Sequence, residues 1–94
     1  MNIPIVSQEE HQKYYQAIIS KELEICRLEI ARGYAEKSLY NLDSALRLAA
    51  LLEDLPPTLE QIREFLESEP AQELVSLPHF NYVRLKFEKL RSKI

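Results

Sequence analysis

The residues best suited to chemistry in this chain are its two histidines, His11 and His79, and its single cysteine, Cys26. A metal site on a helix needs ligands three or four residues apart. Neither histidine has a glutamate three residues before it or a second histidine four residues away. Glu22 and Glu29 flank Cys26 at helical spacing, but Cys26 falls on an apolar stripe, where a lone cysteine usually packs as a small hydrophobic residue. The sequence therefore predicts no metal ligand, no cofactor and no catalytic residue.

The remaining signals of an enzyme are also weak. Gly33 is the only glycine, which excludes the glycine-rich loops that hold phosphates or dinucleotides. A Cys–His nucleophilic pair is conceivable, but nothing around Cys26 indicates an oxyanion hole or an activated thiolate. We predict that the protein is not an enzyme, and a helical-bundle enzyme is the least favoured alternative.

Two segments carry charge of opposite sign. Residues 53–73 hold seven acidic residues against Arg63 alone, and residues 84–94 hold five basic residues against Glu88. A basic helix can contact phosphate or an acidic partner, which makes a nucleic-acid-associated regulator the alternative function. Helical projection disfavours nucleic acid, because it places two of the cations on one side of the apolar face and three on the other. The basic residues are Arg84, Lys86, Lys89, Arg91 and Lys93.

A cluster of leucines lies at the end of the second predicted helix and extends too far around it to face one neighbour. Either later helices cover these leucines, or they form an exposed patch that docks a partner helix or a second copy of the chain. Tyr40 and Tyr82 lie off the main apolar stripes of their helices. This position is typical both of interface anchors and of residues at the edge of a core. The candidate partner-binding residues are Tyr40, Leu48, Leu51, Leu52 and Leu55.

Two predicted helices must position these residues, and the chain reverses direction between them at Gly33. Apolar residues recur at helical spacing on both sides of Gly33, and the two stripes would face nearly opposite directions along one straight helix. Because glycine tolerates the left-handed conformation that ends many helices, a hairpin brings both stripes together. The rival interpretation is one unbroken helix that continues to Asp54. The predicted segments are an extended lead-in over 1–6 and helices over about 8–32 and 34–54.

Proline and capping residues predict where the other helices begin. The pair Pro56-Pro57 should end the second helix, because proline cannot continue its hydrogen-bond ladder. A serine or threonine signals a helix start when a glutamate or glutamine follows it three residues later, or a proline two residues later. These signals are Ser7 with Glu10, Thr58 with Gln61, Ser68 with Pro70, and Ser76 with Pro78. They predict the first helix, a helix over about 59–67, a short helix, and a last helix whose apolar seam is Phe80, Val83, Phe87, Leu90 and Ile94.

We therefore predict one all-α domain over residues 1–94, a small helical bundle. A long N-terminal antiparallel helical hairpin is followed by short helices and a C-terminal helix. Hydrophobic residues make up 46% of the chain and charged residues 29%, which is typical of a folded globular domain. The predicted core consists of Ile18, Ile19, Leu23, Cys26, Ile30, Leu39, Leu42, Leu46, Ile62, Phe65, Leu66, Phe80, Val83 and Phe87.

The segments Gly33–Ala35 and Ala45–Ala49 resemble the second helix of a tetratricopeptide repeat, where small residues let helix pairs stack. The chain departs from that pattern at Glu29 and Leu42, where the repeat has a bulky residue and an aromatic one. No second unit follows, whereas a solenoid of such repeats needs about three. We interpret the resemblance as generic packing of a helical hairpin and assign no family.

The favoured function is a non-enzymatic protein–protein interaction module: an adaptor, a regulator or a small chaperone-like subunit. It would bind a protein partner, or itself as a homodimer, through apolar helix faces. The net charge of −3 argues against a surface that tracks nucleic acid as a whole. The first residues lack the basic start and the apolar core that are typical of a signal peptide, and the longest apolar run, 48–52, is far shorter than the roughly 20 residues that span a bilayer. With one cysteine and hence no internal disulfide, we expect a cytoplasmic protein that contacts no membrane.

Overall fold

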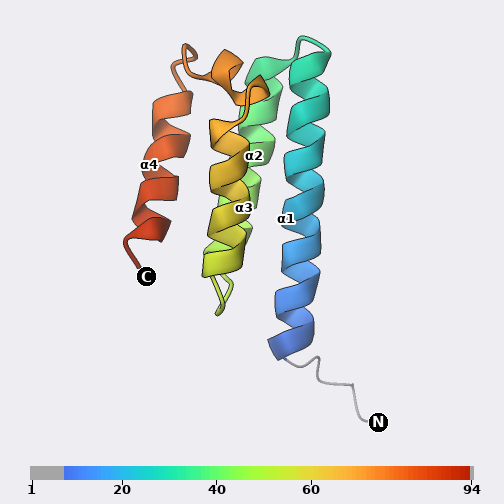
Figure 1. The fold of residues 1–94 in the computed structure, drawn as a ribbon, viewed down its shortest axis with the longest axis vertical. Helices are drawn as coiled ribbons and strands as arrows, with labels where there is room; N and C mark the ends of the chain where they lie inside the picture. Colours follow the sequence, from blue (N-terminus) through green and yellow to red (C-terminus); the bar gives the residue numbers. More distant parts are fainter. Residues whose placement is uncertain (1–7, 94) are drawn as a thin grey trace.

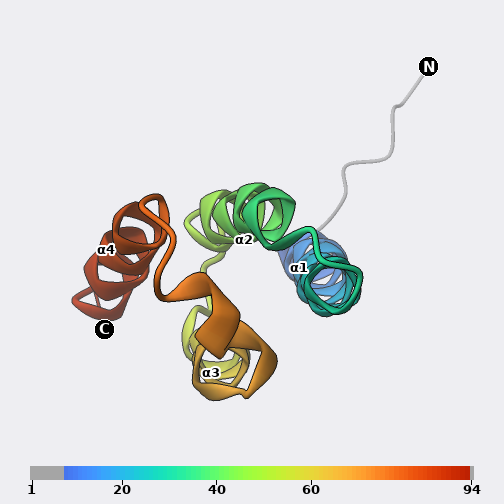
Figure 2. The ribbon, with the colours of Figure 1, turned by 90° about the horizontal axis from the view of Figure 1, so that it is seen from above.

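The computed structural model describes residues 8–93, which form four α-helices and one short 3-10 helix. Successive α-helices run in alternating directions along the long axis (Figure 1), and α2 and α3 lie between α1 and α4 (Figure 2). This arrangement confirms the predicted all-α fold. The predicted lead-in over 1–6, the Ser7 cap and Ile94 lie outside the described residues. The elements are α1 (Gln8–Ala31), α2 (Ala35–Ala49), α3 (Pro56–Glu67), η1 (Pro70–Leu74) and α4 (Phe80–Arg91).

The turn between α1 and α2 is the predicted break at Gly33. Gly33 has a φ of +86°, in the left-handed region, and no other residue in the described range has a positive φ. The N–H of Tyr34 donates to the carbonyl of Glu29 at 2.8 Å. The N–H of Gly33 donates to the carbonyl of Ile30 at 3.1 Å. These two bonds form a Schellman motif, in which a left-handed residue ends a helix and satisfies its last carbonyls. The hairpin is therefore confirmed, and the unbroken helix is wrong.

The second helix ends at Ala49, so the predicted continuation to Asp54 is wrong. A side chain from α1 holds the connection that follows. Oε1 of Gln12 accepts hydrogen bonds from the backbone N–H groups of Glu53, at 3.1 Å, and Asp54, at 3.3 Å. Its Nε2 donates to the carbonyl of Asp54 at 2.6 Å. Gln12 thus provides hydrogen-bond partners for backbone groups of Glu53 and Asp54, which lie beyond the end of the helix.

The third helix begins at Pro56 and not at Leu59. The two prolines take the first helical positions, where an N–H has no partner within the helix in any case. Leu55 is the N-cap residue, so the predicted capping box at Thr58 is wrong. Thr58 lies inside the helix with 2% of its surface exposed, and its Oγ1 has no hydrogen-bond partner among the described residues.

The starts of η1 and α4 both lie later than predicted. Glu69, and not Ser68, precedes η1, which is a 3-10 helix. The Ser68 hydroxyl instead donates to the carbonyl of Phe65 at 2.5 Å, at the end of α3. The N-cap residue of α4 is His79, so the start predicted at Ser76 is wrong as well. Neither Glu69 nor His79 caps its helix through its side chain.

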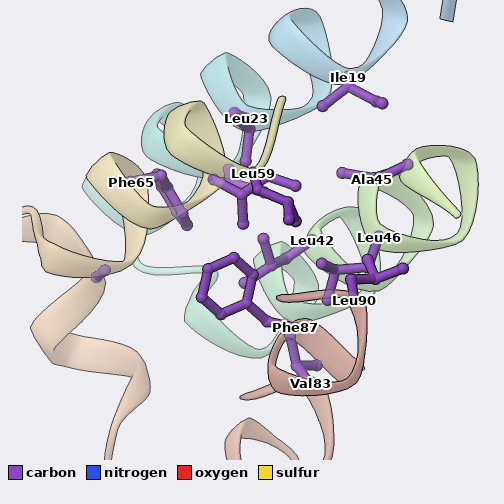
Figure 3. Packing of buried hydrophobic residues seen from close by; sticks show 14 of the residues in the cluster. Ile19, Leu23, Leu42, Ala45, Leu46, Leu59, Phe65, Val83, Phe87 and Leu90 are labelled. Atoms are coloured by element: carbon purple, nitrogen blue, oxygen red, sulfur yellow. The ribbon is translucent and has the colours of Figure 1, made fainter. Parts of the chain in front are cut away.

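One hydrophobic core joins all four α-helices (Figure 3). The predicted core is correct except at Ile18 and Leu66, which are half-buried because they lie at the edges of their stripes. Within residues 8–93, none of the helices combines the length and the apolar character needed to cross a membrane. The predicted core residues that are buried are Ile19, Leu23, Cys26, Ile30, Leu39, Leu42, Leu46, Ile62, Phe65, Phe80, Val83 and Phe87.

Candidate interaction surface

The single thiol is buried between α1 and α2. Cys26 has no exposed surface, and its Sγ donates to the carbonyl of Ser38 at 3.2 Å. Burial, together with the nearby carboxylates of Glu29 and Glu22, raises the pKa of Cys26 to about 12. The thiol therefore keeps its proton at neutral pH and packs as a small hydrophobic residue.

The two histidines are exposed and belong to different parts of the fold. His11 stacks on Tyr15 near the start of α1, with 6.1 Å between the ring centroids. At a rise of 1.5 Å per residue, His11 is about 22 Å along that helix from Cys26. His79 lies just before α4, 5.1 Å from the ring of Tyr82. Over residues 8–93, no three His, Cys, Asp or Glu side chains gather closely enough to hold a metal ion.

The fold divides the predicted leucine cluster. Leu52 and Leu55, each 9% exposed, are buried in the common core, and Leu48 is half-buried against it. Leu51 is 64% exposed. Tyr40 is 69% exposed but lies about two and a half turns before the end of α2. The exposed members of the predicted site, Tyr40 and Leu51, therefore belong to separate surfaces.

Tyr40 instead belongs to a group of aromatic side chains that spans α2 and α4. We call Tyr40, His79 and Tyr82 the aromatic patch. The ring of His79 lies 5.9 Å from that of Tyr40 and 5.1 Å from that of Tyr82. Tyr82 is 50% exposed, and Leu85, one turn further along α4, is 62% exposed. The patch therefore offers amphipathic rings to solvent across the junction of two helices.

An ion bridge ties the two helices together next to this patch. The carboxylate of Asp43 on α2 accepts a hydrogen bond from Nζ of Lys86 on α4 at 2.5 Å and pairs with Arg47 at 3.1 Å. The hydrogen bond to Asp43 raises the pKa of Lys86. Lys86 also lies over the ring of Tyr82, 4.6 Å from its centroid. One buried carboxylate thus pairs with two cations, one of which lies over an aromatic ring.

A groove of about 260 Å³ lies between α2 and α4 beside the ion bridge. We call it the basic groove. Its apolar lining comes from Leu46, Ala50 and Leu90, and its charged lining is entirely cationic. The cations are Arg47, Lys86, Lys89 and Lys93.

The five predicted basic residues divide between two flanks of α4. The three lysines line the basic groove, whereas Arg84 and Arg91 lie on the opposite flank of the helix, where Arg91 pairs with Glu88 at 3.7 Å. Two residues of α2 at this site, Asp43 and Arg47, were not predicted from the sequence. Their spacing of four residues was the only signal, and it is common on exposed helices.

Comparisons of this chain with protein-family models, with curated proteins and with solved structures find no match.

Proposed function

We propose that this protein is a non-enzymatic interaction module that binds a protein partner on the side formed by α2 and α4. The aromatic patch is the observation that carries the proposal. Tyrosine is enriched in protein interfaces, because it adds a large apolar area and a polar hydroxyl while it loses little side-chain entropy. Tyr40 and Tyr82 remain 69% and 50% exposed although the ring of His79 lies against both of them.

The packing beneath the patch also supports an interface. Asp43, 8% exposed, links α2 to α4 by holding Lys86, which lies over the ring of Tyr82. A surface that is ordered before binding loses less conformational entropy on association. The buried, protonated thiol of Cys26 agrees with a packing role in a reducing compartment, and we propose that the module acts in the cytoplasm.

The test is capture of binding proteins from a lysate of the source cells, with the wild type compared with a Tyr40→Ala, Tyr82→Ala variant. A matched control is the Tyr14→Ala, Leu28→Ala variant, which removes two large side chains of similar exposure, 64% and 51%, from α1. We expect the patch variant to lose a partner that the wild type and the control both capture. Capture of the same proteins by all three would contradict the proposal.

Light scattering across protein concentrations determines whether the partner is a second copy of the chain. If the wild type dimerises and the patch variant is monomeric, the module binds itself through this surface. If the wild type is a monomer at every concentration, the partner is a different protein. A dimer that persists in the patch variant would contradict the role of the patch in self-association.

A further inference from the structure

The basic groove has an arrangement that the aromatic patch alone does not explain. Apolar side chains lie between cations that come from both helices: Arg47 from α2 and the lysines from α4. Its volume of about 260 Å³ is below the roughly 300–1,000 Å³ of small-molecule sites. The groove is therefore less suited to an enclosed small ligand than to side chains of a larger molecule that lies across it.

The charge around the groove is only partly neutralised. Within residues 8–93, Asp43 is the one carboxylate paired with these cations, and it is shared between Arg47 and Lys86. Lys89 and Lys93 form no ion pair among the described residues. This excess positive charge belongs to a chain whose net charge is −3, so the cations are concentrated locally on an otherwise acidic protein.

From this arrangement we infer that the basic groove binds an acidic amphipathic helix of a partner protein. Leu46 and Leu90 are 2% and 6% exposed, so apolar residues of that helix at positions i, i+3, i+4 and i+7 would contact mainly Ala50 and the aliphatic parts of the lysine side chains. Glutamates or aspartates beside this apolar stripe would face Arg47 on one side and the lysines of α4 on the other. The inference rests on the proposed function, because it names the class of partner for the same side of the molecule.

Two other occupants fit the observations less well. A second copy of this chain could offer the acidic residues of α3, but the apolar face of α3, Leu59, Ile62 and Phe65, is buried in its own core. Nucleic acid would leave the apolar floor without a matching surface, and Arg84 and Arg91 face away from the groove. Apolar contact and negative charge are both supplied by an acidic amphipathic helix.

The test uses a labelled synthetic peptide and measures its fluorescence anisotropy with the full-length protein. The probe is a capped helix of about four turns that carries leucines at i, i+3, i+4 and i+7 and glutamates beside them. One comparison peptide has the same composition in scrambled order, and another has lysines in place of the glutamates. We expect the acidic amphipathic peptide to bind at least about tenfold more tightly than either comparison peptide, and its affinity to fall with added salt.

Matched charge reversals on one helix locate the binding site. We expect Lys89→Glu with Lys93→Glu to weaken binding at least about tenfold, because attraction on the groove becomes repulsion. The control, Arg84→Glu with Arg91→Glu, makes the same change in net charge on the opposite flank and should stay within about twofold of the wild type. Ala50→Trp fills the groove at an exposed position and should also weaken binding. A circular-dichroism melt of each variant verifies that it is folded.

Several outcomes would overturn the inference. They are equal binding of the scrambled peptide, equal weakening by both charge reversals, and tighter binding of a labelled DNA duplex than of the acidic peptide. If the protein self-associates at low salt and the lysine reversal abolishes this, the occupant of the groove is a second copy of the chain and not an acidic helix of a partner. If the peptide fails to bind while partner capture still depends on Tyr40 and Tyr82, the acidic-helix class is wrong and the proposed function stands. If capture depends on neither tyrosine, the proposed function fails independently.

Discussion

The second helix packs against α1 on one side and α4 on the other, and the two interfaces are built differently. Against α1, polar side chains link the helices along their length: Ser44 donates to Glu22 at 3.1 Å, and Asn41 donates to Glu29. Against α4, the polar link is the ion pair between Asp43 and Lys86. The α1 side is closed by hydrogen bonds, whereas the α4 side leaves aromatic rings and cations exposed.

This difference distinguishes an interface linked by hydrogen bonds from a side of the molecule on which aromatic rings and cations stay exposed. The α1–α2 pair forms the most extensive helix contact in the fold, and its Schellman turn satisfies the helix end. α4 has 12 residues and adds one apolar seam to the core. We therefore attribute most of the stability to the hairpin and to the core it shares with α3, and we propose that binding takes place on the α2–α4 side.

The largest expected effect tests how firmly α4 belongs to the fold. Phe87 on α4 is 4% exposed in the core, so Phe87→Ala should lower the free energy of unfolding by about 3–5 kcal/mol. Total stability of a domain is about 5–15 kcal/mol, so the melting temperature should fall well beyond 10 °C. Thermal melts measure this change, and Leu85→Ala, an exposed position on the same helix, is the control.

Hydrogen exchange of the Phe87→Ala variant then sharpens the contrast between the interfaces. Amides of α4 should lose protection before those of α1 and α2, because the hairpin keeps its own contacts. A melting shift of less than a few degrees would mean that α4 is wrongly placed. Simultaneous loss of protection in all helices would remove the distinction between the two interfaces.

The next largest effect separates adjacent leucines at the end of the hairpin. Leu52 is 9% exposed and Leu51 is 64% exposed. Leu52→Glu should lower the free energy of unfolding by about 2–4 kcal/mol, because it removes core packing and places a carboxylate there. Leu51→Glu should change that free energy by less than about 0.5 kcal/mol. Urea denaturation measures both, and equal effects would show that this end of the hairpin is not closed by Leu52.

The hairpin was predictable because its signal is local. The reversal of the apolar stripes at Gly33 is visible in a short stretch of sequence, and the structure places the left-handed residue there. The end of α2 was not predictable, because Gln12, from a different helix, satisfies Glu53 and Asp54. Thr58 had the pattern of a cap, but the two prolines before it are compatible with a helix that has already begun.

The candidate surface was predictable only in parts. Tyr40 was recognisable because it lies off the apolar stripe of its helix, and projection separated the lysines from Arg84 and Arg91. The basic groove requires α2 and α4 to lie side by side, which neither helix pattern specifies alone. The leucines were ambiguous for the same reason, since burial of Leu52 and Leu55 depends on how the rest of the chain packs around them.

A smaller effect tests the turn that gives the hairpin its shape. Apart from its two chain neighbours, a Cβ at Gly33 would meet no atom within 4 Å among the described residues, so the cost of Gly33→Ala comes from its φ of +86°. We expect a loss of about 1–2 kcal/mol in the free energy of unfolding. Gly33→Asn should lose less, because asparagine tolerates the left-handed region better. Denaturation curves test this order, and an equally stable alanine variant would show that the turn can adopt another conformation.

The smallest expected effect concerns Glu22, whose carboxyl lies at the α1–α2 interface. Burial raises the pKa of Glu22 above its ordinary value of 4.5, although the hydrogen bond from Ser44 opposes this shift. Its other oxygen, Oε2, has no hydrogen-bond partner among residues 8–93. The folded state therefore binds this proton more tightly than the unfolded state does, and the charged carboxylate destabilises the fold above its folded pKa.

Replacement by glutamine should remove this penalty. Glu22→Gln should be more stable than the wild type at pH 7, by within about 0.5 kcal/mol. The difference should shrink as the pH falls through the raised pKa towards 4.5, because the wild-type carboxyl then becomes neutral in the fold. Urea denaturation at several pH values measures it, with Glu24→Gln, an exposed position on the same helix, as the control. A difference that is constant with pH would mean that packing, and not charge, distinguishes the two side chains.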